Sequence, residues 1–497
     1  MTDVASTTAP PAWRIGNGFK VPEWVEPTAI VLILFGFMYL TRRRNYSVFR
    51  RPGDSYFYER VANSAAASPA LLSPRTSTDY WDDDGGLLAD GSLRPLSPAA
   101  ELRRAARNGE NVQHPPKTRR VLGVWTVVTP NSSRFAGHWH SRVLQKFPFL
   151  IEMFYWIVTF FFYRLTAVLS QVWYGGIKTL WDVAQDHGIA LLELEALLLA
   201  PRGATGNGRW LEWRVQQWFL AGGDTLDWRG VWMMLLIRSY ALIHIPGTVG
   251  FIAYYYWAAP NHTRFATVRR TMTLLNLFAF FIFIVYPCMP PRFLPREFGF
   301  VDTVSAEDAQ SVWMSGKYVN KLAAMPSMHF GYAFAIGCVF IVESGVLAGL
   351  RRRADGALFG YNNTSDLEGG VVKYKEGDRP RLDTTLAAAT GEMDDEGYGD
   401  SMADAEASYR RPRWLRLLLF VLGVWYPSWI LLCIIATANH YLLDAVAAAI
   451  VVLVSYLCNR VLFVFVPVED WLLWGLRLEK PVPTTGWVKR DRGRFIR

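Results

Sequence analysis

Three short segments of this 497-residue chain carry the side chains best suited to chemistry. PSMH ends in His329, NHYLLD contains His440 and Asp444, and CMPPRFLP contains Arg292. Histidine can act as a nucleophile or a proton donor, a carboxylate can orient an imidazole, and a guanidinium can hold phosphate oxygens through paired hydrogen bonds. Together these groups would provide what phosphoryl transfer requires.

Each segment also has a purely structural interpretation. Arg292 could be an interfacial anchor, and His329 could be an ordinary residue at the start of an apolar helix. His440 and Asp444, four residues apart, are expected on one helical face, where they could simply join two helices. Ionisable residues in an apolar region are costly, which favours function, so we predict catalytic roles for His440, Asp444 and His329.

The start of the helix after PSMH is a candidate phosphate site. Ser327 lies near the expected N-cap, and the free amides of a helix N-terminus attract anions. We predict that Arg292, Ser327 and Arg296 bind the substrate phosphate. The four cysteines have no CxxC spacing, and no metal-ligand cluster is evident, so we expect neither a metal nor another cofactor.

The composition is that of a membrane protein, with 51% hydrophobic and 15% aromatic residues. A helix needs about 20 mostly apolar residues to cross a bilayer. Seven runs approach that length, at 25–41, 147–173, 234–257, 271–288, 327–350, 415–437 and 441–466. The expected fold is therefore all-α, a polytopic membrane helical bundle of six to seven transmembrane helices.

The basic residues indicate how this bundle is oriented. Threading seven spans places all the Lys/Arg-rich loops in the cytoplasm, at 42–51, 264–270, 351–353, 410–416 and 489–497. The same threading brings the three chemical segments to the opposite face. A net charge of +9 beside apolar runs indicates anionic lipid rather than nucleic acid as the partner.

The chain divides by composition into six parts. Residues 187–220 within the core include two stretches expected to lie along the membrane surface rather than to span it. The parts are 1–52 (N-terminal segment with the first helix), 53–145 (disordered cytoplasmic linker), 146–350 (membrane core), 351–413 (polar cytoplasmic insert), 414–467 (second part of the core) and 468–497 (basic cytoplasmic tail).

In these motifs the sequence resembles the type 2 phosphatidic acid phosphatase superfamily, especially its inositolphosphotransferase-like branch, which includes fungal inositol phosphorylceramide synthase. PSMH is similar to the PSxH element, and His440, Tyr441 and Asp444 are similar to the HYxxD element. The resemblance implies that His440 forms a phosphohistidine, that Asp444 orients it, and that His329 protonates the leaving alcohol. Arg292 would hold the phosphate.

The sequence also departs from the phosphatase pattern. Val285 stands where a lysine is usual, Phe293 follows Arg292 where a proline is usual, and Ile434 stands where the third motif carries an arginine. Loss of two phosphate-binding cations favours headgroup transfer over phosphomonoester hydrolysis. Tyr240 and His244 share a helical face, and we interpret them as a buried polar packing pair.

The resemblance thus predicts a lipid phosphotransferase that passes an inositol-phosphate-type headgroup from a phospholipid donor to a ceramide-like acceptor. The expected location is an endomembrane, Golgi or endoplasmic reticulum, rather than the plasma membrane, with a lumenal active site. Two alternatives stay open: a lipid phosphate phosphatase of the same superfamily, and a non-catalytic membrane scaffold. No particular protein partner is indicated.

Overall fold

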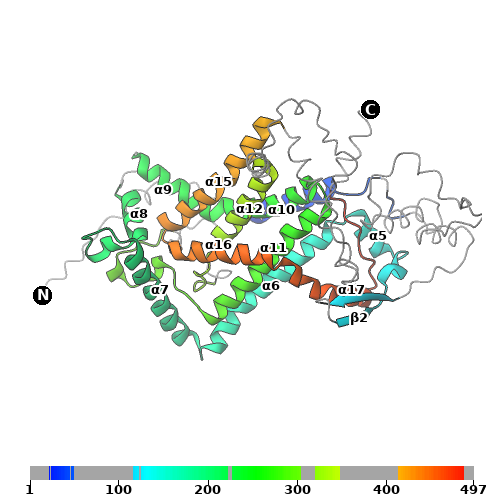
Figure 1. Ribbon diagram of the computed structural model, residues 1–497, viewed down its shortest axis with the longest axis horizontal. Coiled ribbons are helices and arrows are strands. Elements are labelled where there is room, and N and C mark those ends of the chain that lie inside the picture. Colours follow the sequence, from blue (N-terminus) through cyan, green and yellow to red (C-terminus); the bar gives the residue numbers. More distant parts are fainter. Residues whose placement is uncertain are drawn as a thin grey trace, which may run out of the picture.

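The computed structural model describes residues 22, 24–44, 46–49, 116–121, 125–221, 227–303, 320–346 and 412–485. This part of the chain is mostly helical (Figure 1). The expected cytoplasmic insert at 351–413 lies outside it, apart from its last two residues, as do most of the expected linker and the basic residues 489–497.

A bundle of apolar helices forms the body of the molecule. Its members are α2 (Val25–Leu40), α6 (Leu150–Trp173), α10 (His244–Ala258), α11 (His262–Val285), α12 (Met328–Ser344), α15 (Arg413–Ala436) and α16 (Leu442–Leu457). Its largest core cluster buries Phe265, Leu275 and Ile336. Small residues let two helices approach closely, because a Cβ on Gly337 of α12 would lie 2.5 Å from the carbonyl oxygen of Gly423 in α15.

The helices indicate a membrane protein but do not confirm six to seven spans. Within the described residues, α6, α11 and α15 are long and apolar enough to cross a bilayer. Two bent pairs, 228–242 with 244–258 and 442–457 with 459–475, raise the number to five if each pair is one span. Helices α2 and α12 are apolar but have only 16 and 17 residues, fewer than the roughly 20 that a straight span requires.

One end of the bundle is covered by helices that pack across it (Figure 1). They are α7 (Ile177–Leu199), α8 (Leu211–Leu220) and α9 (Trp228–Arg238), with the short η3 (Gly206–Arg209), η5 (Pro291–Phe293) and η6 (Arg296–Phe298). Neither α7 nor α8 is among the candidate spans, in agreement with the amphipathic interpretation of 187–220. The turn η4 (Ser239–Ile243), a π-helix, joins α9 to α10.

The opposite end carries a small folded unit, called here the extramembrane unit. Residues 116–121 and 125–145, the part of the expected linker over 53–145 that the structure describes, are therefore ordered rather than disordered. Residues 117–146 contain an antiparallel hairpin, β1 (Lys117–Val121) and β2 (Trp125–Thr129), then η2 (Ser132–Phe135) and α5 (Trp139–Lys146). The unit packs against α17 (Val466–Gly475), which follows η10 (Asn459–Phe465). Buried Asp470 of α17 accepts hydrogen bonds from Thr129 and Arg119, and this distant partner orders the hairpin.

Ion pairs join the helix ends near this extramembrane unit. Arg269 of α11 lies 2.5 Å from Glu152 of α6, and Arg264 of α11 lies 2.9 Å from Glu343 of α12. Arg416 of α15 donates to the carbonyl oxygens that end α12. These three arginines therefore lie at the same end of the bundle.

Candidate active site

His440 lies in the loop between the end of α15 at Ala436 and the start of α16 at Leu442. Its side chain is buried, and its Nδ1 is 2.8 Å from the carbonyl oxygen of Ala324. Because a carbonyl oxygen can only accept, Nδ1 carries the proton of the neutral ring. Nε2 is then the nitrogen with the free lone pair, as a nucleophile requires.

Asp444 lies close to His440, but not in the way that the spacing predicted. Helix α16 begins only at Leu442, so the two residues do not share a helical face. Instead, Asp444 is in the first turn and its carboxylate accepts from the backbone N–H of Tyr441 at 3.0 Å. The same oxygen is 3.5 Å from Nδ1 of His440, so Ala324 is the nearer acceptor and Asp444 adds a negative charge beside it.

His329 faces His440 from the first turn of α12. The two ring centroids are 5.8 Å apart, so the rings are close neighbours. Two more rings contact His329, those of Tyr240 at 4.2 Å and His244 at 4.9 Å between centroids. The structure thus brings together two histidines that lie 111 positions apart in the numbering of the chain.

Arg292, in η5, is held next to this pair by its backbone. Its N–H donates to the carbonyl oxygen of Ala438 at 3.0 Å, two residues before His440. The side chain is only 6% exposed, and it forms a long ion pair with Asp302 at 3.5 Å. Its Nε is buried and has no hydrogen-bond partner within the described part of the chain. A guanidinium with a buried free donor has the capacity to bind phosphate oxygens.

The other two predicted phosphate ligands lie in different environments. Ser327 is fully buried and is the N-cap of α12, where its hydroxyl oxygen accepts from the N–H of Phe330 at 3.3 Å. Its own N–H donates to the carbonyl oxygen of Asp444, which joins α12 to α16. Arg296 is exposed at the start of η6. Ser327 therefore supports the site from within, whereas Arg296 lies on its surface.

Sequence reasoning missed the helices that support the His440 loop from outside. The hydroxyl of buried Tyr441 donates to the carbonyl oxygen of Met289 at 2.8 Å. Gly188 of α7 packs against both groups. From α8, the carboxylate of buried Glu212 accepts from the N–H of Leu442 at 2.9 Å and so caps α16. The only signal in the sequence was the set of acidic residues in two otherwise apolar surface stretches.

A second carboxyl group, that of Glu195 in α7, is buried beside Glu212. Burial, and then the neighbouring Glu212, raise the pKa of Glu195 from 4.5 to about 9. The folded protein therefore keeps this proton over a pH range in which the unfolded chain has lost it. Because the folded state then binds more protons, this carboxyl favours folding at low pH, and the contribution is lost as pH rises from 4.5 to about 9.

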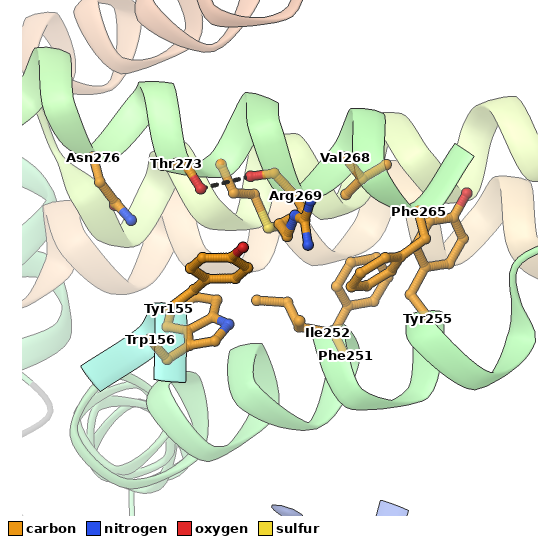
Figure 2. A pocket seen from close by; sticks show the side chains of 11 residues that line it. Tyr155, Trp156, Phe251, Ile252, Tyr255, Phe265, Val268, Arg269, Thr273 and Asn276 are labelled. Carbon is orange, nitrogen blue, oxygen red and sulfur yellow. Dashed lines mark hydrogen bonds between the residues drawn. The ribbon is translucent and has the colours of Figure 1, made fainter. Parts of the chain in front are cut away.

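Two cavities lie away from this cluster. One is about 20 Å³, room for about one water, and is enclosed between α6, α10 and α11. Figure 2 shows its aromatic side chains, among them Tyr155 and Phe251, facing Arg269. The other, about 100 Å³, is lined by residues of α6, α10 and α11 together with Glu469 of α17 and Lys480. Neither contains a predicted site residue, and within the described residues no group of three or more His, Cys, Asp or Glu side chains could hold a metal.

Comparison with known proteins gives one family match. A model described as the PAP2 superfamily, the type 2 phosphatidic acid phosphatases, matches residues 210–348 and 406–458, less than half of the chain. The matched segments contain His329, His440, Asp444 and Arg292. No curated protein and no solved structure matches the chain.

Proposed function

We propose that this chain, whose PAP2 superfamily match supports a lipid phosphatase or phosphotransferase function, is a membrane phosphotransferase that works through a phosphohistidine at His440. The observation that carries the proposal is the position of the His440 ring. Its Nδ1–H donates a hydrogen bond to the carbonyl oxygen of Ala324, so the lone pair of Nε2 is available to attack phosphorus. The ring of His329 is 5.8 Å away, centroid to centroid, on a separate helix.

The first step is attack of Nε2 of His440 on the phosphorus of a lipid phosphodiester. An N–P bond forms, the P–O bond to the leaving alcohol breaks, and protonated His329 gives its proton to that alcohol. The charge on His440 grows in this step, and the Asp444 carboxylate, 3.5 Å from Nδ1, stabilises it. Arg292 neutralises charge on the phosphoryl oxygens.

The second step regenerates the enzyme. An acceptor hydroxyl attacks the phosphorus, an O–P bond forms, and the N–P bond breaks. The proton of the hydroxyl passes to His329, which is ready for the next turnover. With phosphatidylinositol as donor and a ceramide as acceptor, the products are inositol phosphorylceramide and diacylglycerol. The headgroup and acceptor come from the resemblance of the motifs, and Val285 and Ile434 at the two cation positions of the phosphatases favour transfer over monoester hydrolysis.

We further propose that the site faces the lumen of the Golgi or endoplasmic reticulum. The basic helix ends Arg264, Arg269 and Arg416 gather at the end of the bundle with the extramembrane unit. By the positive-inside rule that end is cytoplasmic, and the histidines at the other end are then lumenal.

The test is phosphotransfer by the purified full chain in vesicles, with phosphatidylinositol and ceramide in one arm and phosphatidic acid alone in the other. His440→Asn is the most informative variant, because asparagine keeps an N–H donor near the Nδ1 position for Ala324 but has no Nε2. We expect it to abolish turnover and the acid-labile, base-stable phosphoenzyme.

His187→Asn is the matched control. His187 also bonds a backbone carbonyl oxygen through Nδ1, that of Pro287 at 2.8 Å, but it contacts none of the proposed catalytic groups. Product from phosphatidic acid alone would make the chain a phosphatase. Equal activity of His440→Asn and the wild type would refute the phosphohistidine mechanism, and folded wild type without turnover on either substrate would favour the scaffold hypothesis.

A further inference from the structure

The π turn η4 brings two aromatic residues to His329 that the mechanism above does not use. Single π turns are rare and are frequent at functional sites. The turn spans Ser239–Ile243 and contains Tyr240, and His244 follows it directly. The ring of Tyr240 stacks on His329 with an interplanar angle of 28°. The sequence predicted that Tyr240 and His244 form a packing pair, but it did not predict that both contact His329.

Two histidine rings pack against that of His329. The centroid of His440 lies 5.8 Å from it and that of His244 lies 4.9 Å from it, so His329 is a neighbour of both. In the mechanism above, the alcohol that enters or leaves exchanges its proton with His329. Its oxygen is therefore close to the ring that packs against His329, that of His244.

The two ring nitrogens of His244 differ in their hydrogen bonds. Nδ1 is 3.1 Å from the hydroxyl of Tyr426 on α15, and the nearby hydroxyl of Thr248 donates to the backbone carbonyl of His244. When the Tyr426 phenol donates to Nδ1, the proton of neutral His244 is on Nε2. His244 is only 3% exposed, and among the residues that the structure describes its Nε2 has no hydrogen-bond partner. A buried donor without an acceptor is costly, which points to a ligand oxygen as its partner.

We propose that His244 is the third histidine of this site, and that its Nε2–H donates a hydrogen bond to the oxygen of the alcohol that enters or leaves at His440. The inference rests on the proposed phosphotransfer function. In the second step the alcohol oxygen accepts from His244 while its own proton goes to His329, so each lone pair and proton of the hydroxyl has a defined partner. The O–P bond forms and the N–P bond breaks as before.

This role makes His244 a determinant of the acceptor. A lipid hydroxyl must be held in one place to compete with water, whereas water can reach the phosphorus in many orientations. Loss of the hydrogen bond should therefore lower transfer to the alcohol more than it lowers hydrolysis. The ratio of the two products reports this, because a purely structural defect would reduce both in proportion.

Two substitutions distinguish the roles of the two ring nitrogens of His244. Glutamine places an amide near the Nε2 position, and asparagine places one near the Nδ1 position, where Tyr426 binds. We expect His244→Asn to lower the ratio of ceramide product to released inositol phosphate by roughly 3- to 10-fold, the factor of about one hydrogen bond. His244→Gln should keep the ratio within about twofold of wild type.

The experiment uses the full chain in vesicles that contain phosphatidylinositol and a fixed amount of ceramide, with both products measured in each reaction. The proposal would be overturned if His244→Asn lowered both rates but left the ratio of the two products unchanged. It would also be overturned if the asparagine variant kept the wild-type ratio while the glutamine variant lowered it. His244→Gln guards against misfolding, because it tests the same nitrogen in a second protein. If the wild type makes neither product, the proposed function fails, and the role of His244 fails with it. If the wild type makes both products but the ratio does not change in His244→Asn, only the role of His244 is refuted.

Discussion

Replacement of Gly188 by alanine tests how tightly α7 holds the His440 loop. A Cβ at this position would be 2.8 Å from the carbonyl oxygen of Met289 and 2.8 Å from the hydroxyl of Tyr441, whereas ordinary contact begins at 3.4 Å. One side must move by about 0.6 Å. Neither atom is free, because Tyr441 donates to Met289 and the N–H of Met289 donates to Ala184.

The expected magnitude follows from two opposing effects. Forced overpacking lowers the free energy of unfolding by about 1–3 kcal/mol. Replacing a helical glycine by alanine raises it by up to about 1 kcal/mol. Gly36 in α2 is the matched control, because a Cβ there has nothing within 4 Å. Gly188→Ala should therefore be less stable than Gly36→Ala by about 1–3 kcal/mol.

Activity should fall more clearly than stability. Tyr441 adjoins His440, and a shift of the loop by a fraction of an ångström should lower turnover by about 10-fold, since a 1 Å misplacement can cost about 100-fold. The assays are thermal unfolding in detergent and transfer of the phosphatidylinositol headgroup to ceramide. If Gly188→Ala matches Gly36→Ala in both, the close packing of α7 against the loop does not position His440.

Three further perturbations test other parts of the site. Arg292→Lys keeps the charge but loses the guanidinium fork, so turnover should fall at least about 10-fold with little change in the unfolding temperature; normal turnover would exclude bidentate phosphate binding. Glu195→Gln removes the carboxyl whose pKa is raised to about 9, so the decline in stability between pH 5 and 9 should be smaller than in wild type, as measured by thermal unfolding at both ends; an unchanged slope would contradict its buried protonation. Ser327→Ala removes the N-cap of α12 and should destabilise the protein by about 1 kcal/mol in the same measurement, and an unchanged stability would show that the cap is dispensable.

The fold could be predicted where the sequence carries a local pattern. The apolar runs located the helices, because burial in lipid requires long apolar segments whatever their neighbours are. The hairpin at 117–129 could not be found this way. Its strands are short and partly charged, and what orders them is the carboxylate of Asp470, more than 300 residues away.

The residues proposed for the site were likewise visible in the sequence, since His329, His440, Asp444 and Arg292 are costly residues in or beside apolar helices. Their geometry was not. The spacing of His440 and Asp444 predicted a shared helical face, but the chain forms a loop and a helix cap there. Nothing in a sequence marks the backbone carbonyl of Ala324 as the partner of Nδ1.

The sequence by itself therefore determined which groups are available, a membrane bundle with two histidines, a carboxylate and an arginine toward one face. Only the tertiary structure decided which nitrogen of His440 is free, that His244 lies beside His329, and that Glu212 caps α16. The physical reason is that hydrophobicity is a property of each segment, whereas hydrogen bonds to backbone atoms and ring contacts depend on how distant helices pack.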